Sequence, residues 1–172
     1  MHKYRTHNCN QLNIKNKDDK IILSGWINKK RDHGNLLFID LRDNYGLTQC
    51  VIDKSNSFFK ELEKLQLESV IKVEGIVVAR TTETINKELN TGEVEVKIES
   101  FKVLGHCKEL PMPIFLDQDY SEEIRLKYRY LDLRRKKIHE NIILRSKVIS
   151  FIRNKMIEAG FLEFQTPILT AS

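Results

Sequence analysis

Apolar and polar side chains alternate through much of the N-terminal part of this sequence, with the period of two that is typical of half-buried β-strands. The pattern predicts five strands, at residues 21–27, 36–42, 47–53, 70–79 and 93–103. In the second strand, Leu37 and Ile39 share one face, and Phe38 falls on the other. In the last strand the alternation changes phase at Ser100, which predicts a β-bulge.

Between the third and fourth strands, residues 56–67 have the apolar spacing of a helix. Five strands with a helix after the third follow the order of the OB-fold, a small barrel. Gly25 and Gly75 fall inside strands, where glycine suits the tight bends of such a barrel. We therefore expect a mainly β protein in which residues 1–105 form a five-stranded OB-fold barrel.

A pair of prolines, Pro111 and Pro113, separates the strands from a helical pattern, and residues 106–135 are interpreted as a linker or hinge. Asp119 and Glu122 have the spacing of a capping box at the start of a short helix. This part of the chain is expected to connect two structural regions.

Apolar side chains recur at helical intervals from residue 136, and Gly160 is suited to end this long helix. A short strand is expected after it, at residues 161–167. One helix and one strand are too little for a core. Residues 136–172 are therefore expected to begin a domain that is truncated in this sequence.

The composition is that of a globular protein, with 172 residues, 41% hydrophobic and 31% charged residues and a formal charge of +5. No apolar run is long enough to span a membrane, and no secretory signal opens the chain, so a cytoplasmic location is expected. Cys9, Cys50 and Cys107 form no CxxC pair, so neither a disulfide scaffold nor a zinc site is indicated.

Basic side chains gather at residues 29–31 and at residues 125–137, where seven basic residues accompany one acidic residue. Such clusters can contact phosphate groups. A charged run is more often a solvated surface, however, and the charge alone does not choose between these interpretations.

One aromatic side chain, Phe38, shares a strand face with Asp40 and Arg42. Aromatic side chains on polar sheet faces stack on the bases of single-stranded nucleic acids. The alternative is a strand that coils enough to bury both of its faces. Gln49 lies on the paired strand, and its amide has the donor and acceptor needed to read a base edge.

Three charged side chains are further candidates for contact with a nucleic acid. Arg31 has a planar fork that can stack on a base or pair with a phosphate, Glu95 can accept from a base, and Arg80 lies at a strand exit. Taken singly, each also fits an ordinary solvated side chain. The histidines have no metal-ligand spacing, and no nucleophile elbow, P-loop or dinucleotide fingerprint occurs, so catalysis is not indicated.

Four segments occur in order over almost the whole chain: GWINKKRDHGNLLFIDLRDNYGLTQCVID, NTGEVEV, RLKYRYLDLRR and GFLEFQTPILTAS. Together they resemble the bacterial-type aspartyl-tRNA synthetases. Lysyl and asparaginyl synthetases share the barrel and related segments. The combination of LRDxxGLxQ, RYLDLRR and FLEFQTP points to the aspartyl branch.

The resemblance implies an N-terminal OB-fold that binds the tRNA anticodon, a hinge and the start of a class II catalytic domain. Enzymes of this family are homodimers that activate aspartate with ATP and Mg²⁺ and transfer it to tRNA(Asp). Residues 136–167 match the family's first signature motif, at the dimer interface, with Pro167 as the motif proline. The ATP-binding motifs are absent, so no catalytic residue, cofactor or metal is expected in this chain, which should be inactive alone.

The resemblance also implies roles for single residues. Phe38 would stack on the middle anticodon base, a uridine, and Gln49 would hydrogen-bond the same base. Arg31 would contact the anticodon nucleotides. Glu95 would read the first base, a guanine or its modified form, and Arg80 would lie near the third base, a cytosine.

Two positions resemble family members that charge both tRNA(Asp) and tRNA(Asn). Members that are strict for one tRNA commonly have a leucine where this chain has His33. A second determinant lies in the turn around Glu83 and Thr84, where Thr84 replaces an asparagine seen in some strict members.

The sequence therefore predicts anticodon recognition by part of an aspartate–tRNA ligase. The alternatives are a free-standing OB-fold module that binds single strands without base preference, a scaffold fragment with no RNA role, and a lysyl or asparaginyl relative. A free-standing module leaves the C-terminal helix and the TP segment unexplained.

Overall fold

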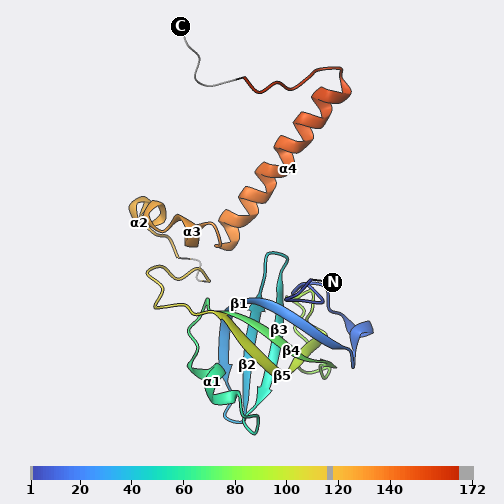
Figure 1. The fold of residues 1–172 in the computed structure, drawn as a ribbon, viewed down its shortest axis with the longest axis vertical. Helices are drawn as coiled ribbons and strands as arrows, with labels where there is room; N and C mark the ends of the chain where they lie inside the picture. Colours follow the sequence, from blue (N-terminus) through green and yellow to red (C-terminus); the bar gives the residue numbers. More distant parts are fainter. Residues whose placement is uncertain (1, 116–117, 167–172) are drawn as a thin grey trace. The chain divides into compact units, whose positions relative to one another are not determined.

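The computed structural model describes residues 2–115 and 118–166, and the chain divides into two compact units, Met1–Leu110 and Pro111–Ser172. The first unit contains a 3₁₀ helix (Ile14–Asn16), strands β1 (Lys20–Asp32), β2 (Leu36–Arg42), β3 (Leu47–Asp53), β4 (Val70–Ala79) and β5 (Val94–Gly105), and helix α1 (Phe59–Lys64), as Figure 1 shows. The second unit contains helices α2 (Glu122–Lys127), α3 (Arg129–Asp132) and α4 (Lys136–Glu158).

The five strands form a closed barrel in the order β1-β2-β3-β5-β4 (Figure 1). Neighbouring strands are antiparallel except β3 and β5, which pair in parallel through Cys50 with Val96 and Val51 with Lys97. Strands β2 and β3 form an antiparallel hairpin, with Leu36 opposite Asp53. The mainly β OB-fold that the strand order predicted is thus confirmed.

The core of the barrel consists of the side chains that the alternation placed on the inner faces. Leu37, Ile39 and Leu41 are at most 2% exposed. Helix α1 adds Phe59 and Leu62 to the same core. This helix is shorter than the predicted 56–67, because the chain turns into the helix only at residue 59 and is already extended again just after residue 64.

Two glycines permit close approach between neighbouring strands. A Cβ atom on Gly25 would lie 2.3 Å from the carbonyl oxygen of Arg42, and one on Gly75 would lie 2.2 Å from that of Lys97. No real Cβ contact is this short, so any larger residue would push the strands apart. The two glycines therefore allow close backbone packing between strands.

Strand β1 extends five residues beyond the predicted end at residue 27, because a bulge changes its phase. The register shifts between Ile27 and Lys29, with Ile27 opposite Leu41 but Arg31 opposite Phe38. Without the extra residue, Arg31 would share the inward parity of Ile27; with it, Arg31 turns to the outer face. The basic triplet at residues 29–31 therefore belongs to a strand.

A second bulge lies in β5, as the phase change predicted. Glu74 is opposite Ser100 and Gly75 is opposite Ile98, so Glu99 is the extra residue. The bulge thus falls one residue before Ser100. It allows Val94, Val96 and Ile98 to remain buried while the strand continues along β4.

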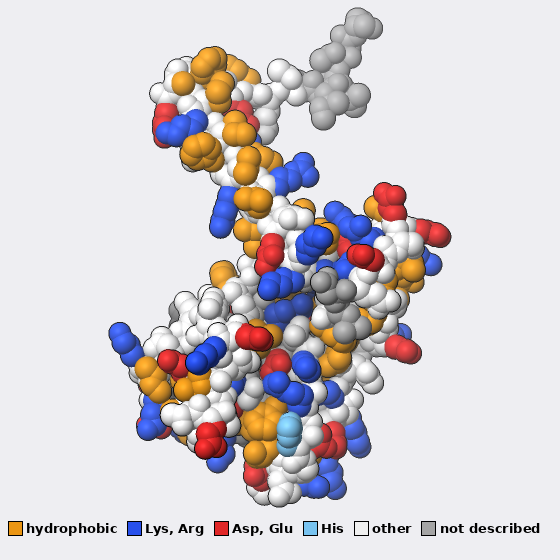
Figure 2. All heavy atoms as spheres, turned by 180° about the vertical axis from the view of Figure 1, so that it is seen from behind, with side chains coloured by type: hydrophobic (Ala, Val, Ile, Leu, Met, Phe, Trp, Pro, Cys, Tyr) orange, Lys and Arg blue, Asp and Glu red, His pale blue; other side chains and the backbone are white. Residues whose placement is uncertain are grey.

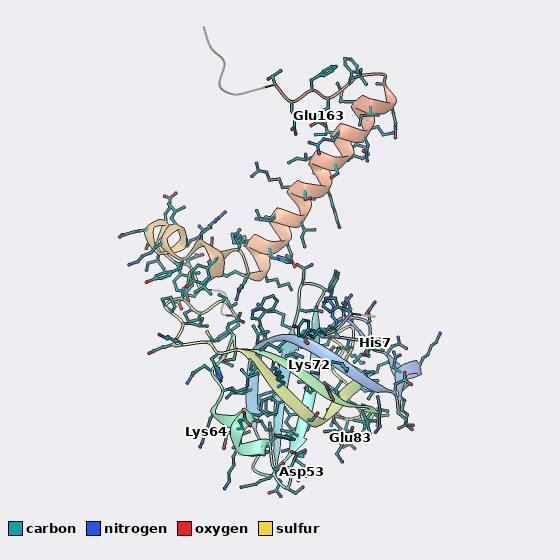
Figure 3. All side chains as sticks on the ribbon, in the orientation of Figure 1. His7, Asp53, Lys64, Lys72, Glu83 and Glu163 are labelled. Atoms are coloured by element: carbon teal, nitrogen blue, oxygen red, sulfur yellow. The ribbon has the colours of Figure 1, made fainter. Side chains whose placement is uncertain are left out.

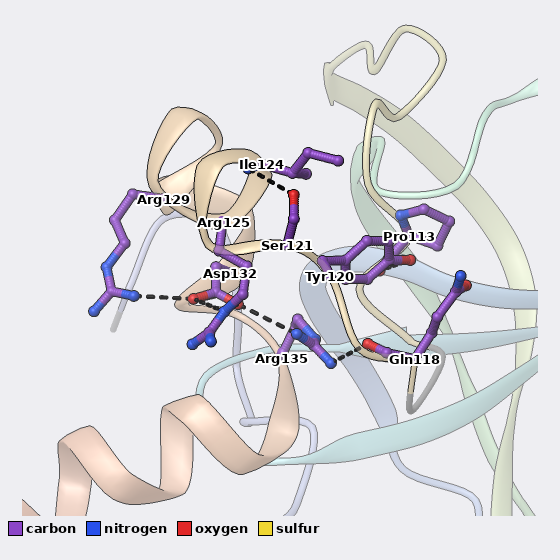
Figure 4. Close-up of polar contacts among 9 residues, drawn as sticks. All are labelled: Pro113, Gln118, Tyr120, Ser121, Ile124, Arg125, Arg129, Asp132 and Arg135. Carbon is purple, nitrogen blue, oxygen red and sulfur yellow. Dashed lines mark hydrogen bonds and ion pairs between the residues drawn. The ribbon is translucent and has the colours of Figure 1, made fainter.

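In the second unit, a buried carboxylate organises the short helices α2 and α3. Asp132 has a fully buried side chain that contacts the guanidinium groups of Arg125, Arg129 and Arg135 at 3.3, 2.9 and 3.4 Å, respectively (Figure 4). The N-cap of α2 is Ser121, whose hydroxyl accepts from the backbone N–H of Ile124. The predicted capping role of Asp119 is therefore wrong.

Helix α4 is followed by Gly160, which has the positive φ of 89° expected beyond a helix end. The exposed apolar side chains of α4 lie along this helix in Figure 2. The strand predicted at 161–167 is not formed at residues 161–166, where the backbone has no strand partner. Pro167, assigned to the dimer interface, lies outside the described residues. Within the described ranges, no helix has the length and apolar character needed to cross a bilayer.

Candidate nucleic-acid interface

The predicted binding residues of the first unit meet on the outer face of the barrel. Arg31 on β1 is opposite Phe38 on β2, and Asp40 on β2 is opposite Gln49 on β3. Directly opposed side chains of antiparallel strands point to the same face. Glu95 on β5 reaches Gln49 across the parallel pair. Residues from four strands are therefore brought together by the barrel.

The side chain of Arg31 is held by two acceptors. Its Nη2 atom donates to Oδ1 of Asp40 at 2.7 Å and to Oε1 of Gln49 at 2.9 Å. Hydrogen bonds from a guanidinium to a carboxylate are among the stronger ones in proteins. The contact with Asp40 therefore fixes a long side chain that would otherwise sample many rotamers.

The amide of Gln49 lies between a cation and an anion. Its Oε1 atom accepts from Arg31, and its Nε2 atom donates to Oε2 of Glu95 at 3.0 Å. A rotated amide would present its NH₂ group to the guanidinium and its oxygen to the carboxylate, and both contacts would be repulsive. The charged neighbours therefore fix the orientation of the amide.

The polar network continues from Glu95 to the loop between β4 and β5. Nε of Arg80 lies 3.7 Å from Oε2 of Glu95, and Nη1 of Arg80 donates to the carbonyl oxygen of Thr84 at 3.2 Å. The side chain of Arg80 is only 4% exposed, and its Nε and Nη2 atoms have no hydrogen-bond partner within the described ranges. Burial lowers the pKa of Arg80, and the nearby Glu95 opposes this shift. The guanidinium of Arg80 therefore combines deep burial with unpaired donors.

The aromatic ring of Phe38 is half-buried beside the network, and its edge contact is with His33. His33 lies in the turn between β1 and β2, where its backbone N–H donates to the carbonyl of Leu36. Gly34, with a φ of 77°, completes this turn. The stacking candidate and the predicted discrimination residue are thus direct neighbours.

The second predicted determinant lies apart from this turn. Glu83 and Thr84 are exposed in the loop between β4 and β5, and Glu83 is labelled in Figure 3. The hydroxyl groups of Thr84 and Thr81 are 3.0 Å apart. Through its carbonyl oxygen, Thr84 contacts Arg80 and so belongs to the same network.

Asp40 shares this face with Phe38, and its sequence position alone indicated no role for it. Asp40 as a whole is 8% exposed. Burial raises the pKa of its carboxyl group, while Arg31, Lys29 and Arg80 oppose this shift. The signal available from the sequence was that Asp40 follows Phe38 by two positions in β2 and so shares its face. The four charged groups of the network, two arginines and two carboxylates, balance one another.

Metal and thiol chemistry have no support in the part of the chain that the structure describes. No group of three or more His, Cys, Asp or Glu side chains there could hold a metal ion. Cys9 and Cys50 are buried, and burial raises the pKa of both thiols, as expected for inert structural cysteines.

Comparison with known proteins relates both units to one group of enzymes. Residues 21–104 match the family model described as an OB-fold nucleic acid binding domain. Residues 121–172 match the model described as class II tRNA synthetases (D, K and N). The whole chain is 74% identical to the aspartate–tRNA(Asp/Asn) ligase of Pelagibacter ubique and 58% identical to that of Phenylobacterium zucineum. This chain belongs to the aspartyl-tRNA synthetase family.

The aspartyl-tRNA synthetase relatives are longer proteins, and the chain spans 29% of the length of each of these two ligases. Among solved structures, it is similar to the asparaginyl-tRNA synthetase of Pyrococcus horikoshii in complex with asparaginyl-adenylate. That match has a TM-score of 0.82 and 27% identity and covers 94% of this chain and 36% of the other. A similar fold therefore occurs in the asparaginyl branch of the class.

Proposed function

We propose that this chain is the anticodon-binding part of an aspartate–tRNA ligase. The domain would occupy residues 1–105, followed by a hinge at 106–135 and the start of the catalytic domain at 136–172. The observation that carries the proposal is the polar network from Arg31 to Arg80, built from hydrogen bonds and an ion pair, which lies beside the half-buried ring of Phe38. Fixed donors and acceptors beside an aromatic ring suit recognition of single bases.

The middle anticodon base would stack on Phe38 and pair with the amide of Gln49. Since Arg31 and Glu95 fix that amide, one hydrogen of Nε2 and a lone pair of Oε1 remain for a base. Uracil offers the complementary pair, an O4 acceptor and an N3–H donor. Cytosine offers an amino donor in place of O4, so the fixed amide would reject it.

The first and third bases would contact the other end of the network. Glu95 is a carboxylate acceptor, which suits the N1–H and N2–H₂ donors of guanine. Arg80 has partly unused donors at its buried guanidinium, which suit the carbonyl oxygen of a pyrimidine at the third position. The three readers therefore follow one another along a single polar track.

We further propose that the parent enzyme accepts tRNA(Asn) as well as tRNA(Asp). The two anticodons, GUC and GUU, differ only in the third base. His33, Glu83 and Thr84 resemble the non-discriminating type, and the two ligases described above bear the name aspartate–tRNA(Asp/Asn) ligase. An imidazole can donate or accept, which suits tolerance of either pyrimidine.

The complete enzyme would use ATP to activate aspartate and would act as a cytoplasmic homodimer. Residues 136–167, with Pro167, would begin the dimer interface. When bound, Mg²⁺ would neutralise phosphate charge on ATP, but the residues in the described ranges supply no site for it. This chain alone is therefore expected to show no aspartate-dependent ATP–pyrophosphate exchange.

The proposal is tested by the binding of this chain to three anticodon stem-loops at two salt concentrations. They carry GUC, GUU and GCC, the last with the middle base changed. We expect GUC and GUU to bind alike and GCC to bind more weakly by about 1–3 kcal/mol, the value of a lost base contact. Equal binding of all three, weakened together by salt, would support a non-specific module instead.

A further inference from the structure

Two carboxylates lie in a surface that is proposed to bind a polyanion. Asp40 and Glu95 offset Arg31 and Arg80, so the network adds no net positive charge. Figure 2 shows acidic and basic side chains interspersed on the barrel. For attraction to phosphates alone, an uncompensated arginine pair would be better. The carboxylates must therefore serve another purpose or weaken binding without return.

For Glu95 the purpose is direct contact with a base, but Asp40 is too enclosed for that. Its side chain is 11% exposed, and its hydrogen bond goes to Arg31. The same Nη2 atom of Arg31 also donates to Oε1 of Gln49. Asp40 therefore contacts the residue that orients the base-reading amide.

We propose that Asp40 is a positioning residue that increases base discrimination at the expense of total RNA affinity. The inference rests on the proposed function and deepens it. By holding Arg31 against Gln49, Asp40 keeps the guanidinium from turning towards a phosphate. It thereby preserves the amide orientation that distinguishes uracil from cytosine.

Arg31 has the freedom that makes such a restraint necessary. Its side chain is 37% exposed, whereas that of Arg80 is 4% exposed and enclosed by its own surroundings. Without Asp40, the long side chain of Arg31 would gain rotamers, and its cation would remain free for non-specific pairing with RNA. Gln49 would then lose the neighbour that fixes its oxygen.

The burial of Asp40 is consistent with a functional role. Burial raises the pKa of its carboxyl group although Arg31, Lys29 and Arg80 all favour the charged form. A charged group that is disfavoured by its surroundings and yet lies on a ligand-binding face is typical of a functional site.

The decisive experiment compares Asp40→Asn with the wild-type chain on the GUC and GCC stem-loops at two salt concentrations. The asparagine keeps the shape and an acceptor oxygen but removes the charge. We expect the GCC stem-loop to bind more tightly while GUC changes little, so that the ratio of their dissociation constants falls about fivefold or more, the lower end of the value of one base contact. The dependence of binding on salt should become steeper.

Glu99→Gln is the matched control, because it removes one negative charge from an exposed position of β5 outside the network. It should shift the binding of both stem-loops equally and leave their ratio unchanged. A second variant, Arg31→Gln, identifies the route. If Asp40 acts through Arg31, then Asp40→Asn should reduce discrimination no further in the Arg31→Gln background.

The outcomes separate this inference from the proposed function. If the wild-type chain does not distinguish GUC from GCC, the proposed function fails. If the wild-type chain discriminates and Asp40→Asn keeps the same ratio, the role of Asp40 is overturned while the function stands. A parallel loss of both affinities, together with a lower melting temperature, would show that Asp40 is merely structural.

Discussion

The imidazole ring of His33 stands edge-on to the phenyl ring of Phe38, with centroids 5.3 Å apart and ring planes at 88°. This T-shaped arrangement is a favourable one for aromatic pairs. It leaves one ring to stack on a base and places the other at its edge. A substitution at either residue therefore changes the surroundings of the other.

Replacing Phe38 by alanine should weaken binding of the GUC stem-loop by about 1–3 kcal/mol, the value of one base–aromatic stack. The measurement is fluorescence anisotropy with labelled RNA. Tyr45→Ala is the matched control, since Tyr45 is an aromatic residue, 54% exposed, in the turn between β2 and β3. An equal loss in both variants would contradict a specific role for Phe38.

Replacing His33 by leucine should make the chain prefer GUC over GUU by about 1 kcal/mol or more, the lower end of the cost of a mismatched base contact. Leucine removes the donor and acceptor that allow either pyrimidine in the third position. Competition between the two stem-loops measures the ratio directly. His7→Leu, at a histidine outside the network, should leave the ratio unchanged, and a shift of the same size there would argue against the role of His33.

Gly25→Ala should destabilise the barrel by at least about 1–3 kcal/mol, the usual cost of overpacking, because the new Cβ atom would lie 2.3 Å from a backbone oxygen. Urea denaturation followed by Trp26 fluorescence measures the change. Gly105→Ala provides the comparison, since its Cβ atom would meet Val70 at an ordinary 3.9 Å. Similar midpoints for the two variants would show that the strands can move apart at little cost.

Asp132→Ala should destabilise the second unit by about 1–3 kcal/mol, because three guanidinium groups would lose a common buried acceptor. Faster hydrogen exchange in α2 and α3, with no change in the barrel, would report the loss. Glu158→Ala removes an exposed ion pair with Lys155 and should cost about 0–1 kcal/mol. Unchanged exchange in α2 and α3 would mean that Asp132 does not hold these helices.

Asp40→Asn should raise the thermal stability of the chain at neutral pH. Burial raises the pKa of Asp40 above its ordinary value of 3.8, so the folded state binds its proton more tightly than the unfolded state. Stability therefore falls as pH rises from that value through the folded-state pKa, and the full penalty remains at higher pH. The neutral asparagine avoids this penalty, so its advantage should disappear below about pH 4. Melting curves between pH 3 and pH 8 would show whether the variant is instead less stable at pH 7.

The fold could be predicted from the sequence wherever apolar alternation was uninterrupted. In β2 the parity of Leu37 and Phe38 correctly assigned the inner and outer faces. The alternation ended at Ile27 in β1, since a bulge reverses parity without any change in residue type. Arg31 consequently could not be placed on a face from its sequence position.

The candidate site was only partly predictable, because its coherence depends on register. Gln49 and Glu95 are 46 positions apart, and no local pattern indicates that they share a hydrogen bond. Phe38 could be selected singly as an aromatic residue on a polar face. Asp40 could not be assigned a role without the knowledge that Arg31 lies opposite Phe38, which precedes Asp40 on the same face of β2.

The parallel pairing of β3 and β5 determines when the candidate site forms during folding. This pairing joins strands β1, β2 and β3 to strands β4 and β5 through residues such as Cys50 and Val96. The hairpin of β2 and β3, by contrast, forms from local contacts. Distant pairings must overcome a larger loss of chain entropy and tend to form late. The hydrogen bond between Gln49 and Glu95 crosses from β3 to β5. The surface that would read an anticodon is therefore assembled only when β3 and β5 pair and the barrel closes. Any partial separation of β3 from β5 would disrupt that surface before the hairpin of β2 and β3 unfolds.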